Sequence, residues 1–129
     1  MYIYTAPTAF RGELPFTSEA PSIARAHLRS FAHGVAAEAL DDAVLMVSEL
    51  VTNALVHGQP AIFLGLRQST DRLSVAVDDF GTATVEMAAP VRGQVSGRGL
   101  IIVNALATRW GVSATETGPG KQVWFDVGS

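Results

Sequence analysis

The segment SELVTNALVHG, residues 48–58, contains three side chains that could do chemistry, Glu49, Asn53 and His57, at intervals of four residues. On an α-helix this spacing places a carboxylate, an amide and an imidazole on one side, one turn apart. Residues 35–59 contain no lysine or arginine, whereas a solvated helix face usually mixes charges of both signs. The pattern favours the floor of a cleft, and a merely solvated polar face is the alternative.

The chemistry that suits this strip is magnesium binding. Magnesium prefers hard oxygen ligands and keeps most of its waters, so one or two protein groups and phosphate oxygens are enough. Asn53 could be the ligand, leaving Glu49 to orient a nucleophile. Zinc fits less well, because the chain has no cysteine and its three histidines, His27, His33 and His57, are widely separated. We expect His57 to be a hydrogen-bonded structural residue rather than a catalyst.

Two glycine motifs follow along the chain. VAVDDFGTA places Asp78 and Asp79 at the end of an apolar strand, with Gly81 just after. This is a common turn composition, but Asp79 could also accept a hydrogen bond from a purine amino group. SGRGLIIVNAL places Gly97 and Gly99 directly before a predicted helix, where free N–H groups suit phosphate, and an ordinary loop-to-helix junction is the alternative. Neither the Rossmann fingerprint nor the eukaryotic-type protein-kinase motif set accompanies these glycines.

Hydrophobic periodicity and turn residues predict the elements that would hold these side chains. Helices are expected between Ser18 and Gly34, over 36–57, closed by Gly58, and over 100–107. Strands are expected at 2–5, 9–14, 61–67, 72–77, 110–115 and 122–127. The core face of the long helix is predicted to comprise Leu40, Val44, Val47, Val51 and Ala54. Grouped strands with three helices indicate an α+β fold: a two-layer α/β sandwich with the helices on one face of a mainly antiparallel mixed sheet.

Length and composition indicate one globular domain spanning residues 1–129. Hydrophobic residues make up 48% of the chain and charged residues 16%, which argues against disorder. The net charge of −3 argues against a nucleic-acid or anionic-membrane surface. The N-terminal sequence lacks the pattern of a signal peptide, and no apolar stretch approaches the ~20 residues that cross a bilayer. We therefore expect a cytoplasmic protein.

Together and in this order, the motifs resemble the GHKL (Bergerat-fold) ATP-binding domain. Within it they look like the anti-sigma-factor serine-protein kinases of the RsbW/SpoIIAB type. ELVTNALVHG is similar to the N box, DFGTA to the first glycine box, GRGLIIVNALATRWGV to the second, and GKQVWF to the terminal strand motif. The resemblance covers about residues 22–125, and the N box with a correctly placed second glycine box is fairly specific for the fold.

The resemblance implies ATP and Mg²⁺ as cofactors and gives each motif a role. Asn53 would hold Mg²⁺ against the triphosphate, and Glu49 would act as the base that accepts a proton from a partner serine or from water. Residues 82–96 would form the ATP lid. The nucleotide-binding residues would be Asn53, Asp79 at the adenine amino group, Gly81 beside it, and Gly97, Arg98, Gly99 and Leu100 at the phosphates.

Three positions depart from the family pattern: Ala83 replaces a glycine of the first box, Gln122 stands where relatives often have a threonine near the adenine, and Val56 replaces a lysine. The first hypothesis is a serine kinase that phosphorylates an anti-anti-sigma (STAS-type) protein and otherwise sequesters a sigma factor. The second is a non-catalytic nucleotide-binding module that regulates by protein contact. A gyrase or chaperone fragment is disfavoured, since no transducer domain follows. The resemblance also suggests a homodimer, for which the N-terminal strands could supply an edge.

Overall fold

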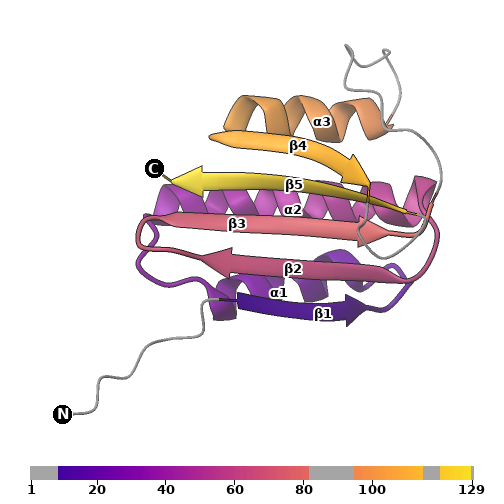
Figure 1. The fold of residues 1–129 in the computed structure, drawn as a ribbon, viewed down its shortest axis with the longest axis horizontal. Coiled ribbons are helices and arrows are strands. Elements are labelled where there is room, and N and C mark those ends of the chain that lie inside the picture. The colour runs from indigo at the N-terminus through magenta and orange to yellow at the C-terminus, as the bar shows by residue number, and fades with distance from the viewer. Residues whose placement is uncertain (1–8, 82–94, 115–119, 129) are drawn as a thin grey trace.

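The computed structural model describes residues 9–81, 95–114 and 120–128, and for residues 95–99 it describes the backbone alone (Figure 1). Within these ranges the elements are, in chain order, β1 (Ala9–Leu14), α1 (Ala20–Phe31), α2 (Ala37–His57), β2 (Ile62–Gln68), β3 (Arg72–Asp79), α3 (Val95–Leu106), β4 (Arg109–Ala114) and β5 (Lys121–Gly128). The strands form one sheet in the order β1-β2-β3-β5-β4. Every pairing between these strands is antiparallel. The α+β sandwich is confirmed, with an antiparallel rather than a mixed sheet in the described residues.

The helices lie on one face of this sheet because its central strands β2 and β3 alternate strictly between buried and less buried residues. On β2 and β3 the buried set includes Leu64, Leu66, Val75 and Val77, all of which belong to the hydrophobic core. The central helix α2 packs on β3 and β5, while α1 packs on β1 and β2 and α3 packs along β4. Figure 1 shows the strands in front of α1 and α2, from the face of the sheet opposite to them. We call that face the open face.

Helix α2 is buried more widely than the sequence pattern predicted. Val44, Val47, Val51 and Ala54 are buried as expected, but residues of the opposite side are buried too, since α1 and α3 cover both flanks of α2. These additional buried residues are Met46 and Leu50. On that second side Leu45 and Val56 remain exposed. One narrow core stripe was therefore the wrong expectation for a helix with neighbours on three sides.

Most predicted boundaries are right to within two residues, and β1 coincides with the predicted 9–14. The clear error is α3, which begins at Val95 rather than at residue 100. Gly97 and Gly99 thus lie within the first turns of this helix instead of before it, because glycine lowers helix stability by only about 1 kcal/mol and does not forbid the conformation. The predicted strand 2–5, the lid except residues 95–96, and most of the turn before β5 lie outside the described residues.

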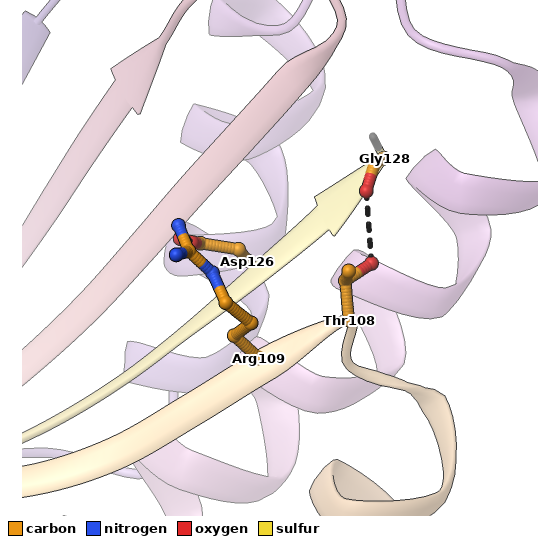
Figure 2. Close-up of polar contacts among 4 residues, drawn as sticks. All are labelled: Thr108, Arg109, Asp126 and Gly128. Carbon is orange, nitrogen blue, oxygen red and sulfur yellow. Dashed lines mark hydrogen bonds and ion pairs between the residues drawn. The ribbon is translucent and has the colours of Figure 1, made fainter.

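The edge strand β4 is fastened to β5 by polar contacts at its first residues (Figure 2). Arg109 Nη2 lies 2.8 Å from Asp126 Oδ2, and Thr108 Oγ1 donates a hydrogen bond of 2.9 Å to the carbonyl of Gly128. The Thr108 N–H also donates to the Asp126 carbonyl. Together these contacts set where β4 starts relative to β5.

Candidate functional site

Four chain segments converge where β3 ends and β5 begins, at the right of Figure 1, and we call this place the converging edge of the sheet. The segments are the end of α2, the end of β3, the start of β5 and the start of α3. Because β3 and β5 are antiparallel, the last residue of β3, Asp79, pairs with the first residue of β5, Lys121. The loop after α2 joins this edge, since the Phe80 N–H donates a 3.0 Å hydrogen bond to the carbonyl of Gln59. The N box, both glycine boxes and the terminal strand motif therefore meet at one place.

The centre of this edge is the buried carboxylate of Asp79. The residue is 3% exposed, and its Oδ1 accepts a 2.6 Å hydrogen bond from the N–H of Gly81. The ammonium of Lys121 lies 3.3 Å from Oδ2 and 3.5 Å from Oδ1. Sequence reasoning missed Lys121. The signal was present, because Lys121 is in phase with Val123, Phe125 and Val127, the buried apolar residues of β5.

Two glycines make room for this carboxylate. A Cβ at Gly58 would lie 2.6 Å from Asp79 Cγ and 2.6 Å from the carbonyl oxygen of Ala54, and one at Gly81 would lie 2.8 Å from Asp79 Oδ1. Gly58 ends α2 as predicted, but its φ of −94° is not the left-handed conformation usual for a glycine after a helix. Gly58 therefore matters for the space that it leaves, and Asp79 rests against the backbone at the end of the long helix.

The amide of Asn53, just over one turn before Gly58, has an unusual environment. Its Oδ1 is buried and, within the part of the chain that the structure describes, accepts no hydrogen bond. Such an oxygen loses its hydration without compensation and calls for an explanation. A hard cation is an adequate partner, so the side chain fits the proposed magnesium ligand. Glu49 lies one turn earlier and is partly buried.

The remaining predicted positions lie on α3 and at the start of β5. Leu100 on α3 is partly buried, whereas Gly97, Arg98 and Gly99 are described by their backbone alone. Gln122, which stands where relatives often have a threonine near the adenine and so puts that base contact in doubt, pairs with Asp78 on the open face, because adjacent residues of a strand point to opposite faces. Lys121 is the residue of that motif beside Asp79.

Two further expectations concern residues at the margins of the site. His57 is exposed at the end of α2, and the hydrogen bond expected for its ring is not found among the described residues. Its place as the last residue of α2 is as predicted. Ala83 lies outside the described residues.

Comparison with known proteins supports this assembly of motifs. The sequence matches the family described as the histidine kinase-like ATPase domain over residues 14–127. The chain belongs to this family. A search of curated proteins found no match.

Two solved structures have the same fold. The first, of the RsbU and RsbW domains of Rv1364c from Mycobacterium tuberculosis, has a TM-score of 0.64 at 22% identity and covers 93% of this chain. The second, the histidine kinase domain of a blue-light-activated histidine kinase from Erythrobacter litoralis, has a TM-score of 0.50 at 23% identity and covers 85% of this chain. This chain spans 31% of the first structure's chain and 58% of the second's.

Membership of this family indicates that the ligand of the domain is a nucleotide. This is an ATPase domain of the histidine kinase-like type, and ATP is the ligand of such a domain. The converging edge of the sheet is where the sequence motifs for that ligand gather. No helix in the described ranges has both the length and the apolar character to cross a bilayer.

Proposed function

We propose that this chain is an ATP-dependent regulatory protein, an anti-sigma factor that phosphorylates a serine of an anti-anti-sigma (STAS-type) partner. The observation that carries the proposal is the buried Oδ1 of Asn53, which has no hydrogen-bond partner among the described residues and lies one turn after Glu49 on the helix whose end meets Asp79. The neighbour that contains an RsbW domain gives it further support. We take residues 1–129 as one domain and the cytoplasm as its location, with a homodimer as a possible assembly.

In this proposal each side chain has one task. Bound Mg²⁺ would neutralise triphosphate charge, which is most of what phosphoryl transfer requires from a protein besides positioning. Asn53 would hold that ion through Oδ1, and Asp79 would accept a hydrogen bond from the adenine amino group. The backbone of Gly97 to Gly99, at the start of α3, would donate N–H groups to phosphate oxygens. The lid expected at residues 82–96 would close over the nucleotide, with its end placed at residue 94 because α3 begins at Val95.

Glu49 would serve the chemical step. A carboxylate one turn from the magnesium ligand can accept the proton of a serine hydroxyl as that oxygen attacks the γ-phosphorus of ATP. ADP is then the leaving group and phosphoserine the product. The partial burial of Glu49 agrees with a position inside a cleft. Sequestration of a sigma factor would be a separate task of the protein surface.

A second candidate is a regulatory module that holds the nucleotide without transferring phosphate. The departures from the family pattern at Ala83 and Gln122 keep it open. In addition, the carboxylate of Asp79 already has two partners, the Gly81 N–H and the Lys121 ammonium. A carboxylate so occupied can stabilise the fold without reading a base. In this case partner binding alone would regulate transcription.

Replacing Glu49, the proposed catalytic base, distinguishes the kinase from the non-catalytic module. Glu49→Gln is nearly isosteric but far less basic, so ATP affinity should be unchanged while transfer to a partner serine falls by about 10²–10⁴-fold. Glu38→Gln, in the first turn of the same helix and exposed, is the matched control and should transfer at the wild-type rate. The assay is transfer of radiolabelled phosphate from ATP to STAS-type proteins co-purified from the native host.

The possible results point to different conclusions. Transfer that is unaffected by Glu49→Gln would show that this carboxylate is not the base. Wild-type protein that binds ATP and its partner but transfers no phosphate would support the non-catalytic module. Wild-type protein that binds no ATP would contradict both candidates.

A further inference from the structure

Lys121 is the only lysine in the sequence, and it lies in the candidate site. Its side chain is 15% exposed, and the Asp79 side chain that it faces is 3% exposed. Burying an ammonium costs several kcal/mol of hydration, and pairing with a carboxylate often does no better than an apolar contact would. Stability therefore gives little reason for a lysine at this position.

The geometry of the contact shows that the ammonium has hydrogen-bonding capacity to spare. Charge-assisted N–H···O bonds are usually about 2.7–2.9 Å long. The two Lys121–Asp79 distances are longer, 3.3 and 3.5 Å. An ammonium has three N–H donors and no acceptor, and among the described residues that of Lys121 is held loosely by one carboxylate, so it still has a donor for another group. Asp79 Oδ1, in contrast, already accepts from the Gly81 N–H.

We propose that Lys121 is a second base-reading residue, which donates a hydrogen bond to N1 of adenine while Asp79 accepts one from the amino group at C6. Adenine presents an acceptor, N1, next to a donor, the amino group. The buried ammonium and carboxylate present the complementary donor and acceptor side by side. This inference rests on the proposed function of the site as a nucleotide-binding site, and it assigns base specificity to a residue that the sequence motifs did not single out.

Two analogues of ATP test the two contacts separately. 1-Deaza-ATP has a C–H in place of N1 but keeps the amino group, whereas purine riboside triphosphate keeps N1 and lacks the amino group. The wild type should bind 1-deaza-ATP about tenfold more weakly than ATP, the effect of removing a hydrogen bond to a charged group. In Lys121→Met this preference should disappear, while the preference for ATP over purine riboside triphosphate should remain. Each comparison is a ratio within one protein, so a general loss of affinity cancels.

The matched control is Gln122→Met, the next residue on β5, which points to the open face. It should keep the wild-type preference for ATP over 1-deaza-ATP. A second readout does not depend on a variant that folds. Protein labelled with [¹⁵N]lysine contains one side-chain ammonium, and its NMR signal should shift when ATP binds and shift much less with 1-deaza-ATP.

The outcomes distinguish this inference from the proposed function. Wild-type protein that binds ATP and 1-deaza-ATP equally, with no difference in the ammonium signal, would overturn the role of Lys121 and leave nucleotide binding intact. Tighter ATP binding by Lys121→Met would show that the lysine competes with the base for Asp79, which would also overturn it. A wild type that binds none of the three nucleotides would instead refute the proposed function.

Discussion

Two buried carboxylates of the sheet pair with a cation, and they do so on opposite faces. On the open face Asp126 is 7% exposed by its side chain and lies 2.8 Å from the guanidinium of Arg109, which is 58% exposed (Figure 2). On the helix face Asp79 is 3% exposed and lies 3.3 Å from Lys121, which is 15% exposed. The first pair is short and its cation is hydrated. The second pair is long, its carboxylate is buried, and its cation is largely withdrawn from solvent.

The difference distinguishes a contact with a clear structural role from one at the candidate site. Arg109 keeps its hydration and, together with Thr108, fastens the edge strand β4 to β5. This contact therefore has a clear structural role. The Asp79–Lys121 pair gives up hydration for a contact of poorer geometry, between two glycines that leave no room for a Cβ. Stability alone gives little reason for such a pair, because burying two charges costs hydration that their attraction often does no more than repay.

The largest expected effect comes from breaking each pair at its carboxylate. Asp79→Asn should lower the free energy of unfolding by about 3 kcal/mol, because the ammonium of Lys121 stays buried without a counter-charge. Asp126→Asn should cost only about 1 kcal/mol, because the exposed guanidinium of Arg109 remains hydrated. Urea denaturation of the two variants beside the wild type measures the difference. Equal losses would show that the two pairs are energetically alike and that burial at the helix face is not decisive.

The next effect compares two buried oxygens that have no hydrogen-bond partner in the described structure, Asn53 Oδ1 and Asp78 Oδ1. Asn53→Ala should weaken magnesium-dependent ATP binding by about a hundredfold, or about 2.7 kcal/mol, because the triphosphate-bound ion loses its protein ligand. Asp78→Asn, whose side chain lies on the open face 3.5 Å from Arg11, should leave ATP binding unchanged. Isothermal titration calorimetry with and without Mg²⁺ measures both variants. Asn53→Ala with wild-type affinity in the presence of Mg²⁺ would exclude this residue as the ligand.

Sequence reasoning was sufficient for what depends on local pattern. The alternation of β2 and β3, the apolar stripe of α2 and the turn between β2 and β3 predicted the fold class and most boundaries, because each depends on residues near one another in the chain. The motifs likewise predicted which segments would carry a nucleotide site, and that assignment stays a prediction. The structure adds that these segments reach one edge of the sheet.

The features that sequence reasoning missed depend on contacts between residues far apart in the chain. That Lys121 rather than Gln122 faces the site follows from the register of β5 on β3, and a shift by one residue would reverse it. That Gly58 provides space for Asp79 depends on how α2 crosses the end of β3. The burial of Met46 and Leu50 depends on α1 and α3 flanking α2. None of these is encoded in the spacing of one segment.

The smallest effect tests whether the tight packing around Asp79 is specific to the helix face. A Cβ at Gly58 would lie 2.6 Å from the Ala54 carbonyl oxygen and 2.6 Å from Asp79 Cγ, so either the end of α2 or the carboxylate must move. Gly58→Ala should therefore cost about 2 kcal/mol of stability, as overpacking usually does, and should weaken ATP binding with it.

Gly65→Ala is the matched control on the open face. Its Cβ would lie 3.7 Å from the Cβ of Ala76, an ordinary van der Waals contact, on a strand where alanine is tolerated at least as well as glycine. Its stability should change by no more than about 0.5 kcal/mol, and its ATP affinity should not change. Thermal unfolding with and without Mg·ATP measures both quantities in each variant. If Gly58→Ala were as harmless as Gly65→Ala, the carboxylate of Asp79 would have freedom to move, and the contrast between the two faces would not extend to their packing.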